Sequence, residues 1–457
     1  MTVATHHTKA ICRRVVAGAA ELQRGVRQLL ADKVSGTLTG MWLLIPEYLR
    51  LGAWDLLRGW TGAAPETVAP RLALQMVNEA ALGVTGVRQQ RCLSQRGFEL
   101  ANGLPFVATD TDIHRLLVQH TVAEALALQT ALGRIRYASG HFEGALLALD
   151  PHRLPSTSIR QMARKAPKHT QPAIKCSQLF FCIDANTEQP LCCMLGSSSQ
   201  CVAQATPKLL DITASILPAT QDTPLLLADV EHFSVALFAH VVKDDRFDLL
   251  VPLPGQPYYK KFLQAIPAAA FTHRWAGFAT AMVPFRFHEA PALPLWCFAQ
   301  RMGERPDEFR YKGFICTAVR DELQALTQEF PKRWNVEEFF NQYQDLGWKH
   351  AGTMNLNIRH GRATLALLAQ AALQQLRQRL PATCATWSTT QLARHLFQGL
   401  DGDIRVQRDT IIVTYYNAPH ADVLAKQYVG LPTRLEQCNV DPRLPWLYGF
   451  KLDFRFK

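Results

Sequence analysis

One apolar run that ends on a carboxylate constrains this chain most. Residues 144–165 have the sequence GALLALDPHRLPSTSIRQMARK, in which Ala145 to Leu149 predict a buried strand and Asp150 stands at its carboxyl end. A carboxylate in that place is held rigidly and exposed only at its tip. This suits a ligand of Mg²⁺, because the ion prefers few, fixed carboxylates. Considered alone, the Asp-Pro pair also fits an ordinary turn after a core strand.

Length and composition predict a folded protein of several structural units. A chain of 457 residues exceeds one ordinary core, and 48% hydrophobic residues exclude a disordered chain. The formal charge of +11 favours a polyanionic partner, either nucleic acid or an anionic membrane surface. The 11 cysteines include no C-x-x-C pair, which favours a reducing compartment. Since the sequence shows no secretory signal and no long uncharged apolar stretch, we expect a soluble, intracellular protein.

The pattern of apolar residues divides the chain into four parts and predicts a mixed α/β fold. Residues 1–140 have helical spacing and predict a helical domain for dimerisation or DNA binding. Strands dominate residues 141–380, within which the aromatic-rich residues 246–312 predict a β insertion. Residues 381–457 predict a small α+β unit, whose clearest part is a hairpin that turns near Arg408.

The order of elements after residue 141 predicts a second carboxylate beside the first. After the strand that ends at Asp150, residues 178–184 (QLFFCID) and the segment LCCML predict an antiparallel pair, and a helix is expected to begin at Pro207. The next apolar run, residues 225–227, is followed by Asp229. Three strands, a helix and a fourth strand place the two aspartates at ends of strands that can lie side by side.

A helix predicted within residues 330–349 carries a third carboxylate. At 100° per residue, one side of this helix forms an apolar stripe of Val336, Phe339, Phe340, Tyr343 and Gly347. Glu337 lies at the edge of the stripe, whereas Glu338 points to solvent. Arg333 precedes Glu337 by one turn, so it can pair with this carboxylate or with a phosphate. Considered alone, the segment is also an ordinary surface helix with an ion pair.

Two stretches without acidic residues favour a phosphate backbone as the partner. No Asp or Glu occurs from Arg153 until Asp184, and none occurs from Leu346 to Leu400. An acid-free run as long as the second is unusual for a solvated face and fits a surface along nucleic acid. The residues predicted to contact DNA are His152, Arg153, Arg160, Arg164, Lys165, Lys349, Arg359 and Arg362; for His152, a structural role in the turn is the alternative.

Together these motifs resemble the DDE transposases of bacterial insertion sequences, in the branch that carries a β insertion. ALLALDPHRLPSTS is similar to the strand that ends in the first catalytic aspartate of the family. LLLADVEHFS is similar to the strand that carries the second, and RWNVEEFF to the helix with the Arg-Trp-x-hydrophobic-Glu pattern. The resemblance covers roughly residues 140–380 well and the N-terminal helices only loosely.

The resemblance implies a ribonuclease-H-like catalytic core in which Asp150, Asp229 and Glu337 bind two Mg²⁺ ions, with Mn²⁺ as a possible substitute. Arg333 would orient Glu337 or stabilise phosphate charge. It also implies a homodimer that cleaves double-stranded DNA at terminal inverted repeats and joins it to target DNA. Such a protein would be cytoplasmic and associated with the nucleoid.

The sequence departs from the family at two positions and leaves alternatives open. In the pattern Y-x2-R-x3-E-x6-K, Phe330 stands in the place of Tyr and Gln344 in the place of Lys, two residues associated with gripping the transposon end. Asp184 also ends a strand; Asp150 is preferred because Asp184 leads directly into a hairpin turn. The alternative functions are a stand-alone ribonuclease-H-like nuclease and a catalytically inactive or repurposed sequence-specific DNA-binding protein.

Overall fold

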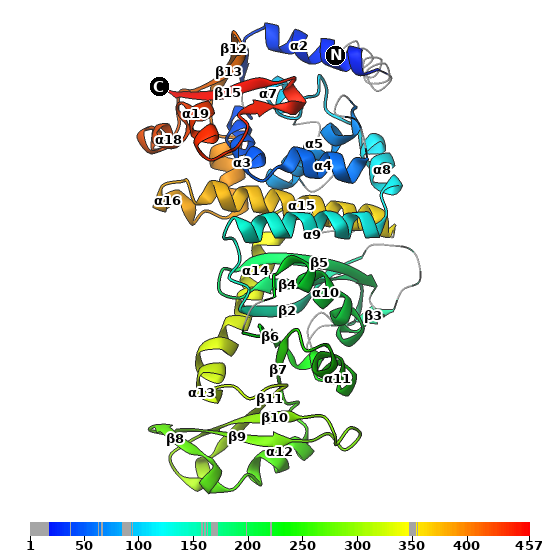
Figure 1. Cartoon of the computed structure of the whole chain (residues 1–457), viewed down its shortest axis with the longest axis vertical. Helices are drawn as coiled ribbons and strands as arrows, with labels where there is room; N and C mark the ends of the chain where they lie inside the picture. Colours follow the sequence, from blue (N-terminus) through cyan, green and yellow to red (C-terminus); the bar gives the residue numbers. More distant parts are fainter. Residues whose placement is uncertain are drawn as a thin grey trace. The chain divides into compact units, whose positions relative to one another are not determined.

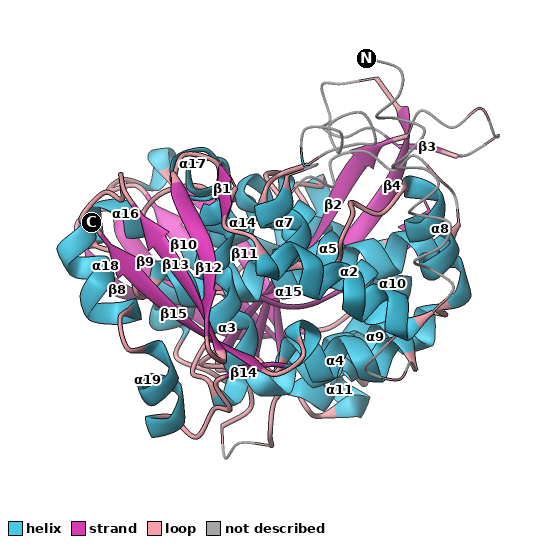
Figure 2. Ribbon diagram, turned by 90° about the horizontal axis from the view of Figure 1, so that it is seen from above, coloured by secondary structure: helices cyan, strands magenta, loops and turns pink. Residues whose placement is uncertain are grey.

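The computed structural model describes residues 18–36, 38–62, 64, 67–84, 93, 95–156, 159, 161, 163–165, 172–197, 199–219, 222–346, 353 and 355–457 (Figures 1 and 2). The chain forms two compact units. The central unit is Gly133–Phe340, and the terminal unit combines Met1–Leu132 with Asn341–Lys457. The boundaries fall inside helices α9 (Val122–Ala138) and α14 (Asn335–Gln344).

A ten-stranded sheet forms the core of the central unit. Its first three long strands are antiparallel neighbours, and two further strands then add in parallel, which gives the order β5-β4-β2-β6-β7. The short strand β3 (Arg164–Lys165) pairs with β4. The five strands are β2 (Leu146–Pro155), β4 (Ile174–Asp184), β5 (Gln189–Ser197), β6 (Leu225–Ala228) and β7 (Asp248–Pro252). Helices α10 (Val202–Ile216) and α11 (Val235–Asp244) connect β5 to β6 and β6 to β7.

Helices cover the two faces of this sheet, and the alternation of side chains decides which residue meets which helix. On one face, the ring of Phe181 in β4 lies 5.1 Å from that of Phe339 in α14. On the other, Cys192 Sγ in β5 lies 3.5 Å from Thr213 Oγ1 in α10. Asp150 is the register partner of Phe181, so its side chain points to the face that α14 covers.

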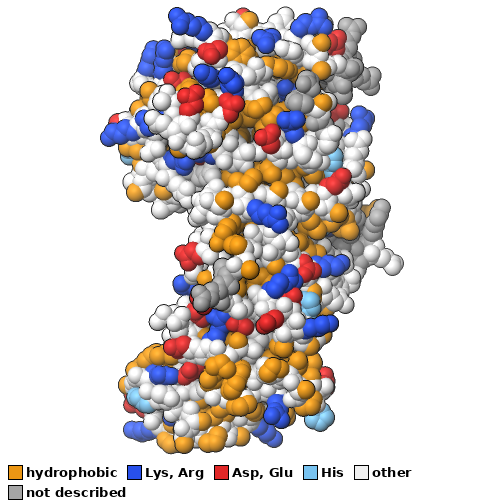
Figure 3. Space-filling model, viewed as in Figure 1, with side chains coloured by type: hydrophobic (Ala, Val, Ile, Leu, Met, Phe, Trp, Pro, Cys, Tyr) orange, Lys and Arg blue, Asp and Glu red, His pale blue; other side chains and the backbone are white. Residues whose placement is uncertain are grey.

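The segment predicted as a β insertion, residues 246–312, is not a separate sheet. Strand β7 belongs to the core, because it pairs in parallel with β6. Four antiparallel strands extend the same sheet beyond it: β11 (Arg310–Cys316), β10 (Leu295–Met302), β9 (Phe278–Phe285) and β8 (Thr272–Trp275). Helix α12 (Pro257–Gln264) lies in the segment for which no helix was predicted. Hydrophobic side chains gather on the surface of this part (Figure 3), where Tyr258 and Trp275 are exposed.

Two helices begin at other residues than the sequence predicts. Helix α10 starts at Val202, and Pro207 lies inside it. The prediction placed the start at Pro207 because proline favours the first helical turn; burial of Val202 and Ala205 extends the helix backwards instead. The segment Phe330–Trp334 is a 3₁₀ turn, η7, and the α-helix begins at Asn335.

The terminal unit contains a five-stranded sheet in the order β1-β12-β13-β15-β14. These strands are β1 (Val34–Gly36), β12 (Gly402–Gln407), β13 (Thr410–Tyr415), β15 (Phe450–Phe456) and β14 (Arg443–Leu444). The predicted hairpin at Arg408 is confirmed as β12 and β13. The same unit contains the helices α2 (Ala19–Ala31), α3 (Ile45–Arg50), α4 (Ala53–Thr61), α5 (Ala69–Ala81), α7 (Arg96–Ala101), α8 (Asp110–Gln119), α15 (Leu356–Arg377), α16 (Ala382–Ala385), α17 (Thr389–Leu392), α18 (Ala421–Tyr428) and α19 (Leu431–Gln437).

This arrangement differs from the predicted division at 140 and 380. Residues 381–457 do not form a unit of their own, because β1 near the N-terminus pairs with β12. Two buried hydrogen bonds fix the same connection: Tyr415 Oη donates to the carbonyl of Thr39 (2.9 Å), and Trp446 Nε1 donates to that of Ala101 (3.0 Å). Helix α15, expected in the catalytic region, packs on α5 and α8 of the terminal unit.

None of the described helices combines the length and the apolar character needed to cross a membrane.

Candidate active site

Asp150 and Asp229 follow the last paired residues of two neighbouring parallel strands. Leu149 pairs with Ala228 at the end of the β2–β6 ladder, so the next residue of each strand is one of the two aspartates. The sequence predicted that this strand ends at Asp150. Strand β2 instead continues to Pro155 through its pairing with β4. Asp150 is therefore held on both sides, and its side chain is only 16% exposed.

Burial and neighbouring carboxylates favour the protonated form of Asp150. Burial raises the pKa of Asp150 most, the nearby Asp229 raises it further, and the guanidinium of Arg333 lowers it. Glu231 and Glu337 add smaller upward contributions, and the resulting pKa is about 8. Two carboxyl groups this close repel each other when both are ionised. A cation placed between them would relieve that repulsion.

Asp229 is oriented by the histidine that follows it by three residues. His232 Nδ1 lies 2.8 Å from Asp229 Oδ1, and the same oxygen accepts a hydrogen bond from the Glu231 backbone N–H (3.1 Å). Burial raises the pKa of Asp229, but the hydrogen bond and charge of His232, together with Arg333, outweigh burial and hold the pKa below its ordinary value. With a side chain only 2% exposed, His232 fixes one rotamer of Asp229.

Arg333 connects the first aspartate to the glutamate of α14. Its Nη1 lies 3.8 Å from Asp150 Oδ2, and its Nη2 lies 3.6 Å from Glu337 Oε1. Glu337 is 44% exposed, whereas Val336, Phe339 and Phe340 are buried, as the apolar stripe predicts. Glu338 is exposed. Because the apolar stripe of α14 packs on the sheet, Glu337 and the preceding Arg333 lie at the edge where the aspartates are.

The carboxylates of Asp150, Asp229 and Glu337 are chemically suited to a hard cation, but their positions fit such an ion only in part. The charge of Asp229 raises the pKa of Asp150, and oxygen ligands of this kind are those that Mg²⁺ prefers. Glu337 lies on the other side of Arg333. In the described part of the chain, no group of three or more His, Cys, Asp or Glu side chains is arranged to hold a metal ion. Asp150 and Asp229 thus form the pair best suited to a cation, with Glu337 as the nearest further carboxylate of α14.

Asp184, the competing first aspartate, has a different environment. Its side chain is buried and accepts four backbone hydrogen bonds, from Glu143 (2.8 Å), Gly144 (2.7 Å), Asn186 (3.0 Å) and Thr187 (2.9 Å). Its register partner is Leu147, so by alternation it points to the sheet face opposite to that of Asp150. These contacts account for Asp184 as a structural residue of the hairpin.

Of the residues predicted to contact DNA near the site, two have partners in the protein. The His152 ring packs on Phe340 at 4.7 Å between centroids, and burial lowers the pKa of His152 to about 4. His152 is therefore uncharged at neutral pH. Arg153 forms an ion pair with Glu231. Arg164, in β3, is exposed.

The other predicted DNA contacts lie elsewhere or outside the described residues. Arg359 is buried in α15 of the terminal unit, which lowers its pKa to about 10. Arg362 Nη2, in the same helix, lies 3.4 Å from His114 Nε2. Both side chains pack within the terminal unit, so the acid-free stretch reflects a buried helix in this part. Arg160, Lys349 and Gly347 lie outside the described residues, as do the side chains of Lys165, Tyr343 and Gln344.

Two functional candidates escaped the sequence interpretation, Glu231 and His232. Glu231 faces Arg153 and raises the pKa of Asp150, and His232 orients Asp229. Both lie in the short turn η3 (Val230–His232), directly after β6. The pattern Asp-x-Glu-His directly after a buried strand could have indicated them, because a turn of this length brings the histidine side chain next to the aspartate.

Comparison with known proteins gives a structural likeness but no matching family. No family model matches the chain, and no curated protein matches it. Among solved structures, a chain in the cryo-EM structure of a piggyBac transposase synaptic complex with hairpin DNA is similar, with a TM-score of 0.43 and 10% sequence identity. The match covers 80% of this chain and 82% of that one. At this TM-score the likeness does not establish a shared activity.

Proposed function

We propose that the protein is a DDE transposase, which cleaves double-stranded DNA at transposon ends and joins the freed ends to target DNA. The observation that carries the proposal is the placement of Asp150 and Asp229 at the end of one parallel strand pair, facing Arg333 and Glu337. The three sequence motifs that resemble bacterial insertion-sequence transposases contain these same residues. The proposal includes the homodimer that the pairing of two DNA ends requires.

The strand order supports a ribonuclease-H-like core as part of this proposal. Three antiparallel strands, a helix, a parallel strand beside the first, a second helix and a further parallel strand follow one another along the chain. In open α/β sheets, functional sites form beyond the carboxyl ends of the parallel strands. Asp150 and Asp229 lie at that edge.

The proposed cofactor is a pair of Mg²⁺ ions, with Mn²⁺ as a substitute. Asp150 and Asp229 would hold metal directly, and Glu337 would contribute the third carboxylate. When bound, such ions supply an activated attacking oxygen and stabilise the oxygen that leaves. Loss of the Asp150 proton would accompany binding, because only the carboxylate binds metal.

The side chains of the protein have separate roles in the proposed reaction. His232 keeps Asp229 ionised and fixed. Arg333, between Asp150 and Glu337, orients both and offers its remaining N–H groups to a phosphate. In cleavage, water oxygen forms a bond to phosphorus while the bond to the 3′ oxygen breaks. In strand transfer, the freed 3′-hydroxyl attacks a phosphodiester of target DNA in the same way, and a second 3′-hydroxyl leaves.

A joining assay tests the proposal by comparing variants of the three site carboxylates with a variant of an exposed neighbouring carboxylate. The substrate is DNA that carries the sequences flanking the coding region, incubated with Mg²⁺ and a target plasmid. We expect Asp150→Ala, Asp229→Ala and Glu337→Ala each to lose joining, while Glu338→Ala, an exposed neighbour, retains it. Retention of joining by the first three variants would refute the proposal.

The two alternative functions give different products in the same assay. A stand-alone ribonuclease-H-like nuclease would cleave DNA with Mg²⁺ but yield no joined product. A catalytically inactive or repurposed sequence-specific DNA-binding protein would bind the DNA and retard it in a gel without cutting it. Terminal inverted repeats beside the coding region would support the transposase over both.

A further inference from the structure

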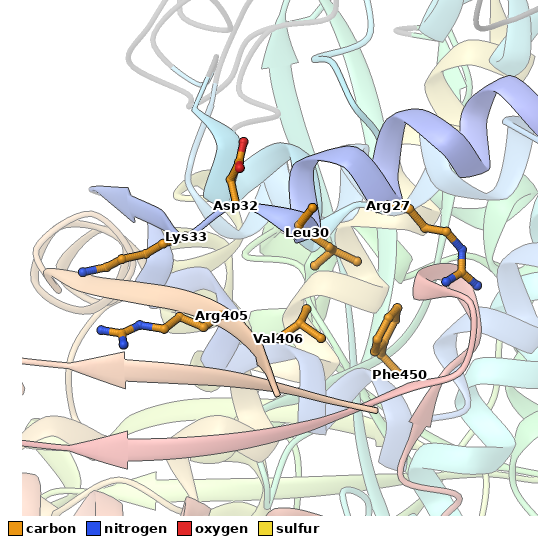
Figure 4. Close-up of a pocket in the computed structure, with 8 residues that line it drawn as sticks. Arg27, Leu30, Asp32, Lys33, Arg405, Val406 and Phe450 are labelled. Atoms are coloured by element: carbon orange, nitrogen blue, oxygen red, sulfur yellow. The ribbon is translucent and has the colours of Figure 1, made fainter. Parts of the chain in front are cut away.

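A pocket in the terminal unit combines cations with an apolar floor. Its volume is about 380 Å³, and it lies between α2, β12 and β15 (Figure 4). Lys33 and Arg405 lie at one end and Arg27 at the other, while the apolar side chains Leu30, Val406 and Phe450 lie between them. The carboxylate of Asp32 points away from this row in Figure 4. The pocket therefore presents mainly positive charge.

A buried carboxylate holds the two cations at the first end. Asp403 is 1% exposed and accepts hydrogen bonds from Arg405 Nε (2.9 Å) and Arg405 Nη2 (3.1 Å), and it forms an ion pair with Lys33 Nζ (3.1 Å). The hydroxyl of Tyr416 donates to the same group. Burial raises the pKa of Asp403, but these contacts outweigh burial and lower it to about 2. Asp403 therefore stays ionised and fixes both cations.

The cations keep capacity for a further anion. Lys33 and Arg405 are each about half exposed, at 51% and 49%. An ammonium has three N–H groups and a guanidinium five, so the contacts to Asp403 use only part of them. Their long side chains are already ordered, which reduces the entropy lost when a ligand binds.

Aromatic rings position the cation at the other end. The Arg27 guanidinium carbon lies 5.8 Å from the ring centroids of both Tyr448 and Phe450. Contacts of this type orient a guanidinium without neutralising it. Arg27 is exposed, so its charge is open to a ligand above the rings.

We propose that this pocket binds the phosphate backbone of double-stranded DNA, as a second contact separate from the carboxylate site. Cations at both ends of an elongated pocket suit successive phosphates of one strand better than a single small anion. The ribose between the phosphates would meet the floor of Leu30, Val406 and Phe450. The choice of DNA as the polyanion rests on the proposed function, whereas the charge and shape of the pocket do not.

The test measures DNA binding by the full-length protein across a range of salt concentrations. Arg27→Gln is the main variant because Arg27 has no part in the Asp403 cluster, and Lys33→Gln is the second because Arg405 and Tyr416 still bond Asp403. Arg24→Gln is the matched control, an exposed arginine one turn earlier in α2 that does not line the pocket. Fluorescence anisotropy with a labelled duplex gives the affinity and its dependence on salt.

We expect each pocket variant to weaken binding, on the order of 10-fold, and to reduce the slope of log affinity against log salt by about 0.9. The Arg24→Gln control should match the wild type in both. Equal behaviour of Arg27→Gln and Arg24→Gln would overturn the inference.

The same assay separates this inference from the proposed function. Its result is compared with that of the joining assay, because the residues changed there, Asp150, Asp229 and Glu337, lie outside the pocket. If the wild type binds DNA through Arg27 and Lys33 but neither cleaves nor joins it, the proposed catalysis fails and the pocket remains. If joining proceeds and the pocket variants bind normally, the pocket assignment fails alone.

Discussion

Asp150 and Asp229 lie next to each other because the parallel pairing of β2 and β6 ends one residue before both. Residues at the same register of a parallel pair have neighbouring side chains, so a shift by one residue would turn one aspartate to the other face of the sheet. The raised pKa of Asp150 follows from this closeness as well as from burial.

The first prediction concerns the pH dependence of stability. The pKa of Asp150 is about 8 in the folded chain, above the ordinary 3.8. Between these values the unfolded chain loses the proton while the folded chain keeps it, so Asp150 destabilises the fold increasingly as pH rises. Without metal, Asp150→Asn should be more stable than the wild type at about pH 8, by roughly 1–3 kcal/mol. The gain should vanish near pH 4.

Thermal unfolding in EDTA at several pH values measures this difference. Addition of Mg²⁺ should stabilise the wild type and not Asp150→Asn, because a ligand that binds only the folded state raises its stability. A gain in stability that is the same at all pH values would show that burial of the charge is not its cause.

The second prediction concerns His232. Its removal in His232→Ala should free the Asp229 carboxylate and weaken Mg²⁺ binding by about 10–100-fold, the range found when a partner of a metal ligand is lost. The Mg²⁺ concentration at half-maximal cleavage measures the effect. His232→Asn, which can still donate a hydrogen bond, should recover part of the loss. Unchanged Mg²⁺ dependence in His232→Ala would contradict the positioning role.

The third prediction separates Asp184 from the site aspartates. Asp184→Ala leaves four backbone N–H groups without their acceptor, and each buried unsatisfied donor costs about 1–3 kcal/mol. We expect a large fall in the urea midpoint. Asp150→Ala should cause no comparable loss. If Asp184→Ala unfolds like the wild type but abolishes cleavage, Asp184 is the first catalytic aspartate.

The fourth prediction concerns Arg153, which the sequence assigned to DNA. Because Arg153 pairs with Glu231, Arg153→Gln should remove one positive charge beside Glu231 and raise the pKa of Asp150 further. The salt dependence of DNA binding should stay unchanged. A slope reduced by about 0.9 would show instead that Arg153 contacts a phosphate.

The sequence predicted the local parts of the site and missed the parts that depend on distant pairing. Strand order and the two aspartates follow from apolar runs, and Arg333 and Glu337 from helical spacing. The pairing of β1 with β12 joins residues far apart in the chain through a strand of three residues, too short to show a period. The burial of Arg359 was missed for a related reason, since an acid-free helix has the same composition whether it faces DNA or a protein core.

The pairing of β1 with β12 also sets an order of events during synthesis. Residues 133–340 form a compact unit within a continuous stretch, so this part can fold on the ribosome before residues 341–457 emerge. The sheet of the terminal unit stays incomplete until its last strand, Phe450–Phe456, has been made. The pocket formed by Arg27, Lys33, Arg405 and Phe450 therefore forms last, after the unit that carries Asp150, Asp229 and Glu337.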